Sequence, residues 1–233
     1  MAIIKRYGVL LFVLLLILHC VFIYWEMASL RTLSKILLIP ILLLYLFANK
    51  PKEETNTEPL VYAGLIFSFL GDLILTRSGE LFFLLGMLAF IGTHVCNGIF
   101  FYRLQKNTVQ RGKGRWLAIL VLAVVSAIVF FVLQPYLGSF QWPILFYMCI
   151  ISCMAVLATG TFDKPSTKKI ATNCFVPGAF LFVLSDALLA MNKFLWHQTV
   201  ADIFVMLTYG AAQYCLVKGF KWHADDAEKT DQH

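Results

Sequence analysis

Long apolar runs separated by short polar segments dominate the sequence. Each run is about 17–24 residues long, close to the roughly 20 residues that a helix needs to cross the hydrocarbon core of a membrane. Strands of a membrane barrel would instead appear as shorter segments with alternating polarity. The pattern predicts eight spans, at about residues 7–25, 30–48, 60–76, 81–104, 115–133, 141–159, 172–191 and 197–217. We therefore expect an all-α integral membrane protein with eight transmembrane helices.

Short polar segments between the apolar runs support the boundaries of these spans. The joining segments are expected at residues 49–59, 77–80, 134–143 and 163–169. Residues 1–217 are predicted to form one transmembrane domain, and residues 218–233 a polar cytoplasmic tail. The first run follows Lys5 and Arg6 as a signal peptide would, but no convincing cleavage site follows it, so we expect a retained helix.

Composition agrees with a membrane protein. The chain is 60% hydrophobic and 14% charged, whereas a soluble domain is about half apolar and about a quarter charged. All six cysteines fall within apolar runs, which favours small hydrophobic residues over disulfides or a metal cluster. The basic pI does not indicate nucleic-acid binding, because a positive excess in a membrane protein marks its cytoplasmic loops.

The distribution of positive charge predicts the orientation. Of the 19 Lys and Arg residues, all lie on the side of the N-terminus except Arg31, Lys35, Arg77 and Lys193. By the positive-inside rule, both termini are expected to be cytoplasmic. Compactness and short loops favour the inner membrane of a bacterium.

Two aspartates lie inside apolar spans and share their surroundings. Asp72 and Asp186 each have a glycine eight residues earlier, a small residue directly before, and aliphatic residues after. A charged side chain in the middle of a membrane helix costs about 2.5–3.5 kcal/mol on insertion scales, so it is rarely kept without a use. The motifs are 114 residues apart, about half the chain. Each falls on the third helix of a four-helix half, which suggests a parallel 4+4 repeat.

Together the two carboxyl groups predict acid–base chemistry. Both lie in the outer half of the hydrocarbon core, where they could meet across a central cavity. Two neighbouring carboxylates do not readily ionise together, so one would act as an acid and the other as a base. The alternative is that each aspartate only hydrogen-bonds to a neighbouring helix.

Other polar residues in the spans are candidate substrate-binding groups. They are Lys35, His94, Asn192, Lys193, Tyr209 and Gln213. Lys35, Asn192 and Lys193 would bind a phosphate head group, while His94, Tyr209 and Gln213 would line the cavity. The alternatives are a snorkelling lysine, a helix end, a packed histidine and interhelical hydrogen bonds. Histidines are too scattered to form a zinc motif, so we expect neither a metal nor another cofactor.

At these positions the chain resembles the YhhN family of eight-helix membrane proteins. The matching pieces are Ser34-Lys35, Pro40, Gly71-Asp72, Gly86, Phe90, His94, Gly178, Phe182, Ser185-Asp186, Asn192-Lys193-Phe194, Tyr209 and Ala212-Gln213. They extend from about residue 30 to residue 215. Ile36 departs from the pattern, because a proline is expected after the lysine.

The resemblance implies a lysoplasmalogenase, which hydrolyses the vinyl ether bond of a lysophospholipid to a fatty aldehyde and a glycerophospho-head group. Asp72 and Asp186 would then be the catalytic acid and base, in either order, with membrane lipids as the surroundings. The alternatives are a proton-coupled transporter or lipid-binding protein that uses the same acidic pair, and a scaffold with structural aspartates. The sequence leaves head-group preference and oligomeric state open.

Overall fold

The computed structural model describes residues 1–50, 58–105 and 112–231, and within these ranges it contains helices and no strand. The first half holds α1 (Ala2–Tyr24), α2 (Ala28–Ala48), α3 (Glu58–Ile74) and α4 (Glu80–Gln105). The second half holds α5 (Lys113–Leu137), the short turn η1 (Gly138–Phe140), α6 (Gln141–Thr159), η2 (Gly160–Asp163), α7 (Pro165–Ile170), η3 (Ala171–Phe175), α8 (Val176–Met191), η4 (Asn192–Trp196) and α9 (Thr199–Asp231).

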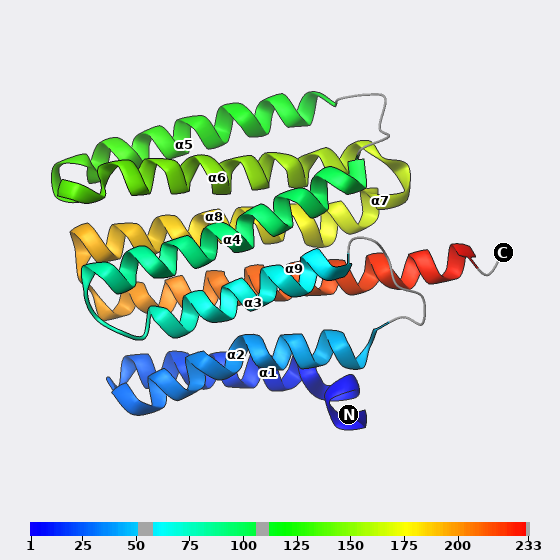
Figure 1. Ribbon diagram of the computed structural model, residues 1–233, viewed down its shortest axis with the longest axis horizontal. Coiled ribbons are helices and arrows are strands. Elements are labelled where there is room, and N and C mark those ends of the chain that lie inside the picture. Colours follow the sequence, from blue (N-terminus) through cyan, green and yellow to red (C-terminus); the bar gives the residue numbers. More distant parts are fainter. Residues whose placement is uncertain (51–57, 106–111, 232–233) are drawn as a thin grey trace.

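The long helices lie side by side along one axis. Figure 1 shows α1 and α2 along one edge, α5 and α6 along the opposite edge, and α3, α4, α8 and α9 between them. Within the central group, α3 packs mainly on α4, and α8 packs mainly on α9. The N-terminal end of α1 and the C-terminal end of α9 lie at the same end of the bundle (Figure 1).

Several helices are suited to a bilayer. Six helical segments of the described chain are long and apolar enough to cross a membrane, and α3 contains a shorter apolar helix, Pro59–Ile74. One of the six segments, Gly114–Asp163, is 50 residues long and contains both α5 and α6, which fold back on each other. The protein is therefore a multi-pass, all-helical membrane protein.

The outer surface of the bundle is apolar along its length and aromatic at its ends. Large exposed hydrophobic side chains follow α1 and α5, the two helices at the edges of the bundle. Trp25 after α1, Trp142 at the start of α6 and Trp196 at the end of η4 are exposed at one end of the bundle, and Trp116 is exposed near the start of α5. Tryptophan favours the boundary between lipid and water, and exposed tryptophans at both ends agree with a bundle that crosses a bilayer.

The predicted boundary between the fifth and sixth spans was wrong. Residues 134–143 were expected to form a loop, but Pro135 lies inside α5, which continues to Leu137. Proline so near the end of a helix removes a single backbone hydrogen bond. The chain reverses only at Gly138, whose φ of +50° suits glycine.

Helix α9 is also longer than the span predicted at residues 197–217, because it continues through the predicted tail to Asp231. Phe220 is buried against Phe100 and Phe175, and Lys221 forms an ion pair with Asp225 one turn later at 2.5 Å. These contacts extend the helix beyond the apolar run. The seventh predicted span, residues 172–191, corresponds to the π-helical turn η3 and α8, and the π-helical turn η4 follows it.

Candidate functional site

Asp72 lies near the end of α3 and contacts groups from two other helices. Its side chain is 3% exposed. Tyr209 of α9 donates a hydrogen bond to Oδ2 at 2.7 Å, and Nζ of Lys35 on α2 lies 3.7 Å from Oδ1. The ammonium group compensates the charge of the buried carboxylate, and the Tyr209 hydroxyl supplies its hydrogen bond. Asp72 is thus half of a buried ion pair.

A second polar layer lies one helical turn from this pair. Gln213 donates a hydrogen bond to Ser68 at 2.9 Å, and the Ser68 and Thr93 hydroxyls are 3.0 Å apart. Thr93 in turn donates to the carbonyl of Gly64 at 3.1 Å. Ser68 precedes Asp72 by four residues, and Gln213 follows Tyr209 by four. The two layers therefore fix the register of α3 against α4 and α9.

Asp186 of α8 has a different set of partners. Tyr147 of α6 donates a hydrogen bond to its Oδ2 at 2.5 Å, and Nε2 of His94 on α4 lies 3.3 Å from the same oxygen. His94 Nε2 also lies 2.9 Å from the Tyr147 hydroxyl, so the three groups form a triangle. The side chain of Asp186 is 12% exposed, and in the described chain no hydrogen bond reaches its Oδ1. That oxygen is free to meet a ligand.

The other ring nitrogen of His94 has no partner. Nδ1 is buried and is the one such unsatisfied side-chain atom in the described residues. With Nε2–H directed at Asp186 and Tyr147, neutral His94 leaves an unused acceptor at Nδ1. A buried polar atom without a hydrogen bond is costly, and functional sites are where this cost is often kept.

An aromatic side chain separates the two carboxylate clusters. The ring of Phe182 lies edge-to-face against His94 at 4.7 Å and against Tyr209 at 5.5 Å. No hydrogen bond joins Asp72 and Asp186 among the described residues. The prediction that they face each other across one cavity therefore needs refinement, since each carboxylate has its own surroundings.

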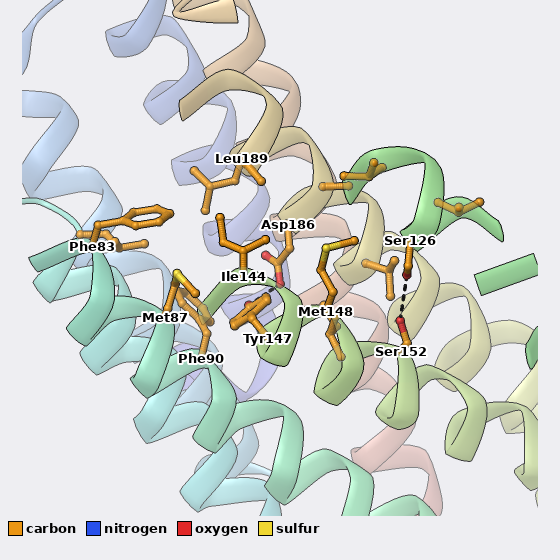
Figure 2. A pocket seen from close by; sticks show the side chains of 17 residues that line it. Phe83, Met87, Phe90, Ser126, Ile144, Tyr147, Met148, Ser152, Asp186 and Leu189 are labelled. Atoms are coloured by element: carbon orange, nitrogen blue, oxygen red, sulfur yellow. Dashed lines mark hydrogen bonds between the residues drawn. The ribbon is translucent and has the colours of Figure 1, made fainter. Parts of the chain in front are cut away.

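Asp186 opens onto an apolar slot between α4, α5, α6 and α8. Figure 2 shows Asp186 and Tyr147 at its centre, with Phe83 and Met87 on one side and Met148 on the other. The slot is narrow, with a cavity volume of about 60 Å³. Towards α5 it ends at Ser126 and Ser152, whose hydroxyls are 3.2 Å apart. Its shape and lining suit a hydrocarbon chain.

Lys35 faces a second cavity, called here the polar chamber, which is larger than the slot. Its volume is about 530 Å³, and it lies between the ends of α1, α2, α3 and α9. Its lining includes His19, Glu26, Arg31, Lys35, Arg77 and Thr199. Leu75 belongs to the linings of both the chamber and the slot, so one side chain stands at the boundary between them.

The two remaining predicted residues lie at the end of α8. The amide of Asn192 donates to Asp202 at 2.6 Å and accepts from the backbone N–H of Gln198 at 2.8 Å, which ties η4 to α9. Lys193 is exposed, with Nζ 5.6 Å from the ring centre of Phe83, a residue of the slot lining. Asn192 is thus engaged within the protein, while Lys193 stands near one end of the slot.

The structure adds Tyr147, Ser68 and Thr93 to the residues predicted from the sequence. Tyr147 lies in a continuous apolar run, where an aromatic residue is normally interpreted as packing. Ser68 carried a weak signal, because it precedes Asp72 by one helical turn. In the described residues, no group of three or more histidine, cysteine, aspartate or glutamate side chains could hold a metal ion.

Comparisons with known proteins identify relatives of this chain. The description "YhhN family" belongs to the family model that matches residues 30–220. Human Lysoplasmalogenase TMEM86A is 30% identical over 159 residues, and the bovine protein of the same name is 28% identical over 155 residues. Each match covers 66% of this chain and 61% of the relative, so the chain spans less than two thirds of either relative. No solved structure matches significantly.

Proposed function

Because this chain belongs to the YhhN family, we propose that it is a membrane-bound hydrolase of lysoplasmalogens, the activity for which its human and bovine relatives are named. The carrying observation is the position of the two carboxyl groups: Asp186 opens onto an apolar slot, and Asp72 is paired with a lysine of a polar chamber. A lysoplasmalogen has a charged head and a single hydrocarbon chain, and its vinyl ether lies where they meet. The substrate therefore matches the site in polarity at both ends.

Asp186 is the proposed proton donor. A vinyl ether cleaves when an acid protonates its β-carbon, which belongs to the hydrocarbon part of the molecule. Asp186 lines the apolar slot, and its Oδ1 has no hydrogen bond within the described residues. Tyr147 and His94 hold the other oxygen and so orient the acid. General acid catalysis by a positioned carboxyl group contributes about 10²–10⁴-fold to a rate.

Asp72 is the proposed base. Lys35 places an ammonium group 3.7 Å from its carboxylate, and the polar chamber that Lys35 lines would admit the attacking water. The carboxylate also stabilises the cation formed in the reaction, as the second carboxylate does in glycosidases. These roles refine the sequence-based hypothesis, which left the order of acid and base open.

The steps conserve protons. The C=C electrons take the proton of Asp186 and form a C–H bond, which leaves an oxocarbenium ion at the carbon next to the ether oxygen. Water adds to this carbon and gives a proton to Asp72, forming a hemiacetal. The hemiacetal then breaks its bond to the glycerol oxygen, and that oxygen receives the hydroxyl proton. Return of the proton from Asp72 to Asp186 restores the site, after one water has been consumed.

The remaining predicted residues have supporting roles in this proposal. Tyr209 holds Asp72, and Gln213 holds Ser68 in the next layer. Lys193 stands at one end of the slot, and Asn192 anchors the helix end that carries it. No metal or other cofactor is needed for these steps.

We also propose that the bundle crosses the membrane eight times as a parallel 4+4 repeat. The spans are α1 to α6, the continuous path through α8, and α9. Each aspartate contacts the second helix of its own half, through Lys35 or Tyr147, and the fourth helix of the other half, through Tyr209 or His94. This crossed exchange is what a two-fold relation between the halves would produce.

The glycines of the repeated motif support the same relation. A Cβ at Gly64 would lie 3.4 Å from Cys96 of α4, and one at Gly178 would lie 3.1 Å from Cys215 of α9. In each half, the glycine eight residues before the aspartate lets the third helix approach the fourth closely. The repeat therefore extends from the motif to the packing around it.

The proposed topology places both termini in the cytoplasm. An even number of spans agrees with the observation that both ends of the chain lie at one end of the bundle (Figure 1). The positive-inside rule assigns that end to the cytoplasm. A bacterial inner membrane stays a prediction from the sequence.

The test is aldehyde release from a lysoplasmalogen by detergent-purified protein, measured beside Asp72→Asn and Asp186→Asn. Asp163→Asn is the matched control, because Asp163 lies outside the site in η2. We expect release that resists a chelator and is abolished in both site variants. Substantial activity in folded Asp72→Asn would contradict the mechanism, and no release from any vinyl ether lipid would favour a transporter.

A further inference from the structure

The four positive residues that break the charge pattern of the sequence gather at one end of the bundle. Arg31, Lys35 and Arg77 all line the polar chamber, and Lys193 lies beyond the end of α8. Two helix ends bring the lining cations together: the first two turns of α2, which carry Arg31 and Lys35, and the turn after α3, which carries Arg77. An isolated cation at a membrane surface needs no explanation, but three in one cavity of about 530 Å³ form a site for an anion.

These cations differ in whether their side chains already have a partner within the protein. Arg31 is bonded to Asp202 at 2.6 Å, and Lys35 is paired with Asp72. Arg77 is exposed, and its guanidinium lies 5.6 Å from the ring centre of Phe82, which leaves its N–H donors available. Of the three cations, Arg77 is therefore the one whose N–H groups are most available to bind a phosphate group.

The same chamber contains an acidic group. Glu26, in the turn between α1 and α2, is exposed and has no ion pair or hydrogen bond from its side chain in the described residues. Its backbone has a φ of +55°, a conformation that residues other than glycine rarely adopt and that the turn imposes here. A free carboxylate in the same cavity as free guanidinium donors can bind a ligand that carries both charges.

We propose that this chamber binds a zwitterionic phosphate–ammonium head group, with Arg77, Arg31 and Lys35 facing the phosphate and Glu26 facing the ammonium. The inference rests on the proposed function, and it assigns the part of the substrate that Asp72 and Asp186 do not touch. Phosphoethanolamine and phosphocholine head groups have this chemistry. Arg77, Arg31 and Glu26 are the binding residues it adds.

Leu75 connects this site to the reaction. It lines both cavities and follows Asp72 by three residues on the same helical path. Its side chain occupies the space beside Gly86, where an added Cβ would lie 2.5 Å from a Leu75 methyl carbon. A head group in the chamber places its glycerol beside Leu75, and the hydrocarbon chain then continues into the slot past Asp186. The vinyl ether reaches the carboxyl groups because only a few bonds separate it from the phosphate.

Three vinyl ether lipids with the same chain separate the two charges. They are an alkenyl lysophosphoethanolamine, an alkenylglycerol phosphate without the ammonium, and a neutral alkenylglycerol. Arg77→Gln should lower kcat/KM for both phosphate lipids about tenfold relative to the neutral lipid, the effect of one charge-assisted hydrogen bond. Glu26→Gln should lower the ratio of phosphoethanolamine to glycerol phosphate lipid severalfold. Arg6→Gln, at the opposite end of α1, is the matched control and should leave both ratios unchanged.

A binding measurement separates this inference from the proposed function. Saturated alkyl analogues of the same three lipids cannot react, and their affinity for the purified protein can be measured directly. If the wild type releases no aldehyde but Arg77→Gln still weakens binding of the phosphate analogues alone, the hydrolase proposal fails and the head-group site stands. Unchanged phosphate-to-neutral ratios in Arg77→Gln, in turnover and in binding, would overturn the site.

Discussion

The two aspartates of this bundle have matching neighbours but different environments. Each accepts a hydrogen bond from a tyrosine, at 2.7 Å for Asp72 and 2.5 Å for Asp186. The second partner differs, because Asp72 has the ammonium of Lys35 and Asp186 has the imidazole of His94. The adjoining spaces differ as well: one is a polar chamber and the other an apolar slot.

In the proposed mechanism, this difference gives the two copies of the motif separate roles. We propose that Asp72, beside an ammonium group and a polar chamber, acts as the base, and that Asp186, in an apolar slot, acts as the acid. Phe182 packs against a member of each cluster, His94 on one side and Tyr209 on the other. Experiments that change the second partner or the adjoining space should therefore affect the two sides unequally.

The largest effect is expected from Asp186→Asn. The amide keeps the size of the side chain and can still pair with Tyr147, so the fold should persist with little change in Tm. Aldehyde release should fall about 10²–10⁴-fold, because the proposed proton donor is lost. Measured aldehyde release together with Tm in detergent tests this, and an active Asp186→Asn would remove the proposed difference between the aspartates.

Lys35→Met should affect stability as well as activity. It leaves the Asp72 carboxylate buried without its cation, and such a loss costs about 3–5 kcal/mol. The double variant Lys35→Met with Asp72→Asn removes both charges and should recover most of the stability but no activity. Thermal unfolding of the single and double variants measures the coupling. A Tm for Lys35→Met equal to that of the wild type would contradict the ion pair.

Tyr147→Phe and Tyr209→Phe form a matched pair, since each deletes one hydroxyl that donates to an aspartate. Each should cost about 1–3 kcal/mol of stability, because a buried acceptor loses its partner. The effects on kcat should differ: Tyr147→Phe changes the orientation of the acid directly, whereas Asp72 retains Lys35 in Tyr209→Phe. Equal losses of kcat in the two variants would argue that the environments are equivalent.

The smallest effect is expected in the slot. Ala190 lines it one helical turn beyond Asp186, so Ala190→Phe should fill part of the space for the hydrocarbon chain. The KM for long-chain substrates should rise a few-fold, while short-chain substrates should be less affected. Val121→Phe, on the exposed side of α5, is the control for an added aromatic side chain. Chain-length profiles of the two variants that coincide would indicate that the chain lies elsewhere.

Much of the site could be predicted from single polar residues in apolar spans. Asp72, His94, Asp186, Tyr209 and Gln213 stand out because a polar group in hydrocarbon is costly. The first four belong to the two carboxylate clusters, and Gln213 belongs to the polar layer one turn away. The division between the clusters could not be predicted in this way. Helical spacing defines the face on which a residue lies, but the partner across 92 or 137 residues depends on which helices pack together.

The missed residues have physical explanations. Tyr147 resembles a packing residue, because it is an aromatic side chain in an apolar run and its hydroxyl is the one polar group that it carries. The length of α9 was underestimated because its end is polar overall while Phe220 is buried. Residues 51–57, within the predicted segment 49–59, lie outside the described residues.

The boundary at Leu75 has a consequence for the fate of the products. Cleavage at this point would convert one amphiphilic molecule into two products, a water-soluble fragment and an apolar aldehyde. The glycerophospho fragment would be left in the polar chamber, next to the interface marked by exposed tryptophans, and the aldehyde would be left in the slot beside lipid-facing α5. Each product could then depart without passing the other, so accumulation of aldehyde in the bilayer should not prevent the water-soluble fragment from leaving.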